Sequence, residues 1–207
     1  MNHLVLLGDS IFDNRAYVEG GLAVIDQVQQ RVPPGWRASL LAVDGDTSAD
    51  VTQQLKRLPP DASHLVLSVG GNDALGCLNL MGTPVSNLMD ALGVLAEWQR
   101  VFQVSYAGAV TELLDLKLPL IACTIYDSVP GMPTALMTAL SLFNDVIVRE
   151  AMRYGLPVLD LREILTEVAD YSVVSPIEPS SQGGEKLANE IASWAISLAN
   201  DLSHSRR

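Results

Sequence analysis

The chain alternates short apolar runs with longer amphipathic stretches, and this pattern constrains its fold more than any other feature. The apolar runs are bounded by turn residues, which is typical of buried strands. They cover residues 3–7, 39–43, 64–69, 118–126 and 157–159. Between them the pattern predicts helices over residues 17–31, 48–58, 87–116, 135–154 and 182–203. The third is either continuous or broken near Gly93 or Ala107.

Strands that alternate with helices along a chain form parallel sheets with helices on both faces. We therefore predict an α/β fold with three layers, α/β/α, around a five-stranded parallel sheet of flavodoxin-like order. The 207 residues suffice for one domain of ordinary size. No repeat, low-complexity tract or linker divides the sequence, so we expect a single domain over residues 1–207.

The composition argues against several classes of partner. The 13 Lys and Arg residues against 24 Asp and Glu give a net charge of −11, whereas nucleic-acid binding needs clustered cations. No segment reaches the ~20 apolar residues of a membrane-spanning helix. The sequence starts without a cationic leader, and Cys77 and Cys123 show no CxxC spacing. We therefore expect a cytoplasmic protein with no nucleic-acid partner and no membrane span.

Three predicted strands end in residues that carry chemistry, and the carboxyl ends of parallel strands meet at one crevice. The first ends in Gly8–Ser10, where the Ser10 hydroxyl can act as a nucleophile beside backbone N–H donors, or can cap a helix. The second ends at Gly45, whose backbone can approach a ligand closely. The third ends in Gly70–Asp73, where the Asn72 amide can donate to an oxyanion or form an Asx turn.

Together these tips resemble three sequence blocks of the SGNH hydrolases, also called the GDSL esterase and lipase family. Gly8–Ile11 resembles the first block, Gly45 the glycine of the second, and Gly70–Asp73 the third. The resemblance covers nearly the whole chain in order. It implies hydrolysis of an ester through an acyl-enzyme on Ser10. It also implies an oxyanion hole built from the backbone N–H groups of Ser10 and Gly45 and the side-chain amide of Asn72.

The last block of that family is Asp-x-x-His ahead of a final helix, and here the chain departs from the pattern. The corresponding residues are Ser175–Glu178, so both the aspartate and the histidine are replaced. We do not expect another histidine to substitute. His3 and His64 begin strands at the opposite edge of the sheet, about 23 Å from the Ser10 tip for His3 at ~3.3 Å per residue. His204 is expected in a polar tail after the last helix.

Glu178 occupies the position of the missing histidine and is the candidate base. A carboxylate can accept a hydroxyl proton, and burial can raise a glutamate pKa toward a useful value. The alternative for Glu178 is a loop or capping role. Asp13, three residues after Ser10, is an alternative base, or an acid at a helix N-terminus. Asp127, at the fourth tip, is a candidate auxiliary carboxylate.

The leading prediction is a serine hydrolase, an esterase or lipase, that cleaves a carboxylic ester of a small or lipid-like substrate. Two alternatives stay open: a catalytically silent protein that binds an acyl or carbohydrate ligand, and an acyltransferase. No G-x-S-x-G, P-loop, dinucleotide-binding or His/Cys metal motif occurs, so we expect no cofactor and no metal. Four apolar side chains are candidates either for an acyl pocket or for core packing: Met81, Leu88, Met89 and Met132.

Overall fold

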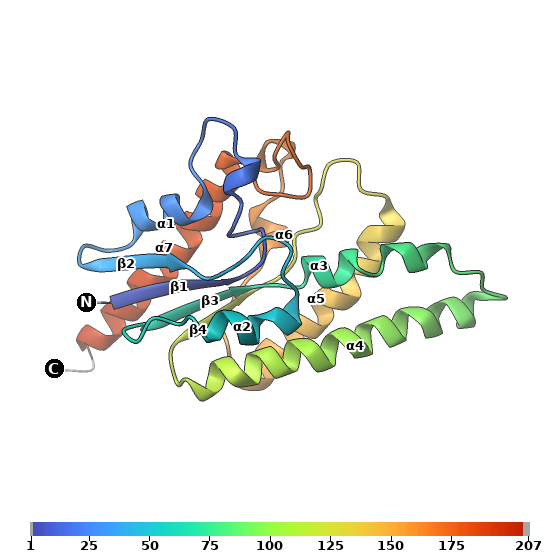
Figure 1. The fold of residues 1–207 in the computed structure, drawn as a ribbon, viewed down its shortest axis with the longest axis horizontal. Coiled ribbons are helices and arrows are strands. Elements are labelled where there is room, and N and C mark those ends of the chain that lie inside the picture. The colour runs from blue at the N-terminus through green and yellow to red at the C-terminus, as the bar shows by residue number, and fades with distance from the viewer. Residues whose placement is uncertain (1, 205–207) are drawn as a thin grey trace.

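The computed structural model of the chain describes residues 2–204, with side chains described through residue 198. The described residues contain a five-stranded parallel sheet in the flavodoxin-like order β2-β1-β3-β4-β5 (Figure 1). The strands are β1 (Asn2–Gly8), β2 (Trp36–Leu40), β3 (His64–Ser68), β4 (Leu120–Cys123) and β5 (Val158–Leu159). The predicted sheet order is confirmed.

Helices connect the strands and cover both faces of the sheet, which confirms the three-layer α/β/α fold (Figure 1). The α-helices are α1 (Val24–Arg31), α2 (Val51–Leu55), α3 (Gly71–Leu75), α4 (Leu88–Asp115), α5 (Thr134–Tyr154), α6 (Leu161–Ile164) and α7 (Ser181–His204). Short 3-10 helices are η1 (Arg15–Tyr17), η2 (Ser48–Asp50), η3 (Leu78–Gly82) and η4 (Val168–Asp170). Helix α4 is continuous through Gly93 and Ala107, so the alternative of a broken helix is wrong.

The side chains of β1 alternate between two hydrophobic cores, one on each face of the sheet. Leu4 and Leu6 belong to the core that α1 and α7 cover. Val5 and Leu7 belong to the core that α4 and α5 cover. All four side chains are fully buried. Because both faces of β1 are covered, its sequence is a continuous apolar run rather than a polar–apolar alternation.

The second strand begins earlier than predicted. β2 covers residues 36–40, not 39–43. Leu41 and Ala42 are buried beyond its end, and their N–H groups both donate to the Leu6 carbonyl, at 2.8 and 3.1 Å. The apolar run therefore marks burial correctly but misplaces the strand, because a buried chain can leave the sheet ladder and keep its hydrogen bonds.

The helix predicted over residues 17–31 begins only at Val24. Gly20 adopts φ +67°, a left-handed conformation that ends any helix, and Gly21 follows it. The residues directly after Ser10 form a turn, in which the Phe12 N–H donates to the Asp9 carbonyl at 3.1 Å. The segment directly after Ser10 is therefore not the start of a helix.

Candidate active site

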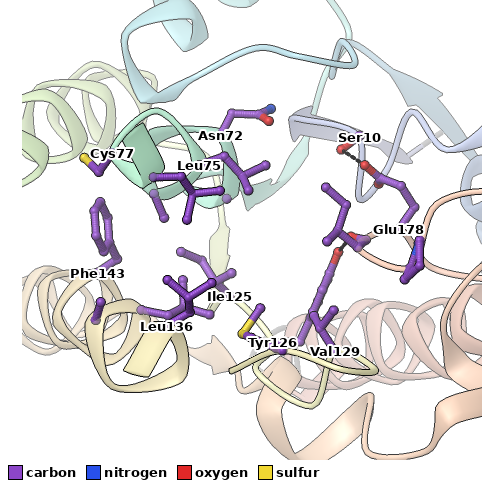
Figure 2. A pocket seen from close by; sticks show the side chains of 18 of the residues that line it. Ser10, Asn72, Leu75, Cys77, Ile125, Tyr126, Val129, Leu136, Phe143 and Glu178 are labelled. Carbon is purple, nitrogen blue, oxygen red and sulfur yellow. Dashed lines mark hydrogen bonds between the residues drawn. The ribbon is translucent and has the colours of Figure 1, made fainter. Parts of the chain in front are cut away.

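The first and last loops bring Ser10 and Glu178 together at the carboxyl end of the sheet. The Ser10 hydroxyl Oγ donates to Glu178 Oε1 at 2.9 Å (Figure 2). Ser10 is the second residue after the end of β1, and Glu178 closes a turn in which its own N–H donates to the Ser175 carbonyl at 2.9 Å. The Asn14 side chain connects the two loops by donating to the Pro179 carbonyl. Both members of the Ser10–Glu178 pair are buried.

Burial changes the acid–base behaviour of Glu178. Desolvation raises its pKa to about 7, with a further rise from the charge of Asp44, while the hydrogen bond from Ser10 opposes the shift. Its second oxygen, Oε2, is buried and accepts no hydrogen bond from the described residues. A base whose pKa lies near the working pH is well matched to take a hydroxyl proton. Glu178 therefore has the position and the acidity that a general base for Ser10 needs.

A second buried carboxyl group, Asp9, lines the same site. Burial raises the pKa of Asp9 to about 7, and the charge of Glu178 adds to this rise, whereas a hydrogen bond from the backbone N–H of Ile11 opposes it. Because the two carboxylates repel, ionising one makes the other harder to ionise. An ionised Glu178 therefore makes Asp9 harder to ionise.

Gln54 holds the first strand tip against the second. Its Oε1 accepts from the Gly8 N–H at 2.9 Å, and its Nε2 donates to the Gly8 carbonyl at 2.6 Å and to Asp46 Oδ2 at 2.7 Å. Gly8 itself has φ +131°, and a Cβ there would lie 1.7 Å from the Ser68 carbonyl oxygen, so only glycine fits. The sequence analysis missed Gln54, because nothing in a short polar stretch distinguishes a buried brace from a surface glutamine.

Asp73 holds the third tip against the second. Its Oδ2 accepts from the backbone N–H of Ser48 at 2.9 Å, and its Oδ1 accepts from the Ser48 hydroxyl at 2.6 Å. In the same loop, Thr47 and Asp50 form a capping box at the start of η2. The three tips are thus joined by side chains rather than by proximity alone.

The three predicted oxyanion donors lie on these braced tips. Asn72 Nδ2 donates to the Asp46 carbonyl at 2.8 Å, which leaves its second amide hydrogen for a ligand. The backbone N–H groups of Ser10 and Gly45 have no acceptor among the described residues. Ser10 and Asn72 line the same cavity (Figure 2), whereas Gly45 lies on an exposed loop outside it with φ +88°. The oxyanion hole that the resemblance implies stays a prediction.

The two candidate auxiliary carboxylates lie outside the cavity. Asp13 Oδ2 accepts from the backbone N–H of Asp44 at 3.1 Å, in a turn rather than at the N-terminus of a helix. Asp127 is half-buried beyond Tyr126, which does line the cavity. Neither is hydrogen-bonded to Ser10 in the structure, where Glu178 accepts from that hydroxyl.

The histidines lie away from this site. His3 is fully buried at the amino end of the sheet, with Nδ1 3.1 Å from Asp61 Oδ1 and Nε2 2.7 Å from Ser39 Oγ. His64 begins β3. Helix α7 extends to His204, so this residue is not in a tail, and its side chain lies outside the described residues.

An apolar cavity of about 340 Å³ opens beside Ser10. Its walls come from the tips of β1 and β4, from α3, η3, α4 and α5, and from the loop that carries Glu178 (Figure 2). Met81 and Met132 line it. Leu88 and Met89 do not line it and are 74% and 75% exposed, so for these two both alternatives, pocket and core, are wrong.

A serine at the carboxyl end of β1 and an asparagine amide line one cavity of a flavodoxin-like sheet, as the resemblance to the GDSL-type hydrolases implies. Residues 6–185 match the family model of the GDSL-like Lipase/Acylhydrolase family. The chain therefore belongs to this family, whose members are esterases and lipases, and the resemblance inferred from the sequence is confirmed. No curated protein matches the chain.

Solved structures of esterases and lipases share the fold. The acetylxylan esterase Axe2 from Geobacillus stearothermophilus is 18% identical, with a TM-score of 0.66 over 94% of each chain. The extracellular lipase from Streptomyces rimosus is 16% identical, with a TM-score of 0.67 over 94% of this chain and 100% of that chain. The psychrotrophic esterase EstA from Pseudoalteromonas sp. is 13% identical, with a TM-score of 0.64 over 97% and 100%. At these identities the likeness shows the fold alone. Within residues 2–204, no helix is long and apolar enough to cross a membrane.

Proposed function

We propose that the protein is an esterase that hydrolyses a carboxylic ester through an acyl-enzyme on Ser10, with Glu178 as the general base. The observation that carries this proposal is the 2.9 Å hydrogen bond from the Ser10 hydroxyl to Glu178 Oε1 in a buried site. Glu178 stands where the family has its histidine, and burial raises the pKa of Glu178 to about 7, into the range where a base works at neutral pH.

In the acylation step, Ser10 Oγ attacks the ester carbonyl carbon while its proton passes to Glu178. The developing negative charge on the carbonyl oxygen is stabilised by the free N–H groups of Ser10 and Gly45 and the second amide hydrogen of Asn72. As the tetrahedral intermediate collapses, Glu178 gives the proton to the departing alkoxide, which leaves as an alcohol. In deacylation, Glu178 takes a proton from water, the resulting hydroxide attacks the acyl carbonyl, and the proton returns to Ser10.

A carboxylate base needs less support than an imidazole. The aspartate of an Asp-x-x-His block orients a ring and balances its positive charge, and neither task arises with glutamate. The Glu178 loop is instead fixed by its backbone: the Glu178 N–H donates to Ser175, and the Ser172 N–H donates to the Glu178 carbonyl at 2.8 Å. The Tyr126 hydroxyl donates to the neighbouring Ile177 carbonyl.

The acyl-enzyme can be trapped and located. The purified protein is mixed with p-nitrophenyl butyrate, quenched in acid within the first turnover and examined by intact-mass and peptide mass spectrometry. We expect a butyryl adduct on the peptide that contains Ser10 and none in the Ser10→Ala variant. Ser39→Ala is the matched control, because Ser39 is bonded to His3 at the opposite edge of the sheet and should keep the adduct.

Two results would overturn the proposal. No adduct and no release of p-nitrophenol, with esters from acetate to decanoate, would indicate a silent binding protein. A stable adduct that water does not remove, but that an added alcohol converts into a new ester, would indicate an acyltransferase.

A further inference from the structure

A run of exposed apolar side chains lies between α3 and the first turns of α4. We name residues 75–92 the α3–α4 arm. Figure 1 shows this arm extending beyond the carboxyl ends of the strands, away from the sheet. Eight of its apolar side chains are at least 39% exposed: Leu75, Leu78, Leu80, Met81, Val85, Leu88, Met89 and Leu92. A cluster of this kind on a monomer usually marks an interaction surface.

The arm also lacks charge in a strongly charged protein. No charged residue stands between Asp73 and Asp90, although the whole chain carries a net charge of −11. A helix face that is merely solvated carries charged side chains. An uncharged apolar surface on an anionic protein suits a neutral or zwitterionic apolar partner, whereas the rest of the surface repels an anionic one.

The arm is continuous with the cavity that holds Ser10. Leu75, Leu78 and Met81 are exposed on the arm and also line the cavity. The same apolar surface therefore leads from the outside of the molecule to the nucleophile. A second copy of the chain seated on the arm would cover this entrance, while a lipid surface seated on it would supply acyl chains directly to the cavity.

We propose that the α3–α4 arm is a docking surface for a zwitterionic lipid–water interface. Leu88 and Met89 insert among the acyl chains, and an aliphatic ester enters the cavity past Leu75 and Met81. The insertion follows from apolar burial, as for other proteins that lie on a membrane surface. The delivery of an ester to Ser10 rests on the proposed function, but the docking itself does not.

Docking is tested with the Ser10→Ala protein and phosphatidylcholine vesicles, so that no lipid is hydrolysed during the measurement. Co-sedimentation gives the partition coefficient. We expect Leu88→Asp combined with Met89→Asp to lower it about 100-fold, because two apolar side chains lose their burial in lipid. Met152→Asp is the matched control. The exposed fraction of Met152, 76%, is nearly that of Met89, but Met152 lies near the end of α5, at the opposite edge of the sheet. It should leave the partition coefficient within twofold.

The outcomes separate the docking surface from the catalytic site. In the protein that keeps Ser10, Leu88→Asp combined with Met89→Asp should leave the hydrolysis of water-soluble p-nitrophenyl acetate unchanged. Two results overturn the docking proposal, whatever the esterase activity. One is that the Ser10→Ala protein does not bind the vesicles, and the other is that the arm variant and the Met152 variant lose equally in partition coefficient. A concentration-dependent dimer that the arm variants dissolve, without vesicle binding, assigns the arm to a second copy and also overturns it. Vesicle binding without hydrolysis of any ester overturns the proposed function alone.

Discussion

The side chain of Asn14 joins the loop after Ser10 to the loop that carries Glu178, because its Nδ2 donates to the Pro179 carbonyl at 3.1 Å. Its Oδ1 accepts from the backbone N–H of Val24 at 2.9 Å, and the side chain is fully buried. Asn14 therefore links the loop after Ser10 to the loop that carries Glu178.

Replacing this link should affect catalysis more than a comparable change elsewhere. Asn14→Ala leaves a buried N–H and a buried carbonyl unpaired, which should lower the free energy of unfolding by about 2–4 kcal/mol, and we expect kcat to fall at least tenfold. Gln27→Ala is the control, because Gln27 is also buried and donates to the Leu22 and Ser181 carbonyls but is not hydrogen-bonded to the turn directly after Ser10. Urea unfolding and ester hydrolysis measure the two effects. An equal loss of kcat in both variants would mean that Asn14 only stabilises the fold.

The pH dependence of activity should report the ionisation of Glu178. Glu178 accepts a proton only when it is ionised, and burial raises its pKa to about 7. kcat/KM should therefore rise about tenfold per pH unit below 7 and level off above it. Because the charge of Asp44 contributes to the raised pKa, Asp44→Asn should move the midpoint to lower pH by a fraction of a unit. Asp26→Asn, which changes a surface aspartate paired with Arg15, should leave it in place.

The same buried carboxyls should make the protein less stable as the pH rises. Burial raises the pKa of Asp9 from 3.8 and that of Glu178 from 4.5, both to about 7. The native state therefore keeps protons that the unfolded chain has lost between about pH 4 and 7. The stability that these protons confer is complete below about pH 4 and is lost as the pH rises through 7. Urea unfolding at pH 4.5, 6 and 8 should show this decline in the wild type and a flatter one in Glu178→Gln. Parallel declines would contradict it.

Asn72 should contribute to the transition state rather than to the fold. Asn72→Ala removes one donor to the oxyanion, and loss of such a donor typically lowers kcat about 10²–10³-fold. KM should change little, because the charge appears only after attack. Asn79→Ala, an exposed asparagine on the neighbouring η3, serves as the control. Steady-state kinetics with p-nitrophenyl butyrate distinguish the two, and a loss confined to KM would place Asn72 in substrate binding instead.

Restoring the family's last block is a further test of what Glu178 replaces. The turn from Ser175 to Glu178 is closed by a backbone hydrogen bond of 2.9 Å, so the two side chains stem from opposite ends of one tight turn. Ser175→Asp combined with Glu178→His should be active with a histidine-controlled pH profile, and Glu178→His alone should be at least tenfold weaker, because its imidazole lacks the orienting acid. Equal activity of the two variants would show that no acid is needed here.

The sequence predicts the sheet well because its strands are short, apolar and placed between turns. The order of the strands and the positions of Ser10 and Asn72 near their tips follow from that pattern and from the family resemblance. The place of Glu178, in the loop before the last helix, follows from the resemblance alone. The predicted start of α1 is wrong, because Gly20 and Gly21 interrupt a stretch whose pattern is otherwise helical. A periodic pattern reports which residues share an apolar face, and it does not include the cost of two adjacent glycines in a helix.

The braces of the site could not be predicted from the sequence. Gln54, Asn14 and the Ser48–Asp73 pair act through contacts between residues that are far apart in the chain. Polar residues in loops and very short helices show no clear periodicity, so a brace and a solvated side chain have the same appearance in one sequence. The same reason explains why Leu88 and Met89 were expected inside, because an apolar residue at a helix start gives no sign of whether another element covers it.

The most direct measurement of the central claim is kcat/KM for p-nitrophenyl butyrate at pH 8, compared between the wild type and Glu178→Gln. The amide preserves the size of the side chain and can still accept from the Ser10 hydroxyl, but it cannot take the proton. If Glu178 is the general base, the variant should lose between about 10²- and 10⁴-fold in rate and should lose the rise in activity around pH 7. Activity within fivefold of the wild type, with the pH dependence intact, would contradict the Ser10–Glu178 dyad.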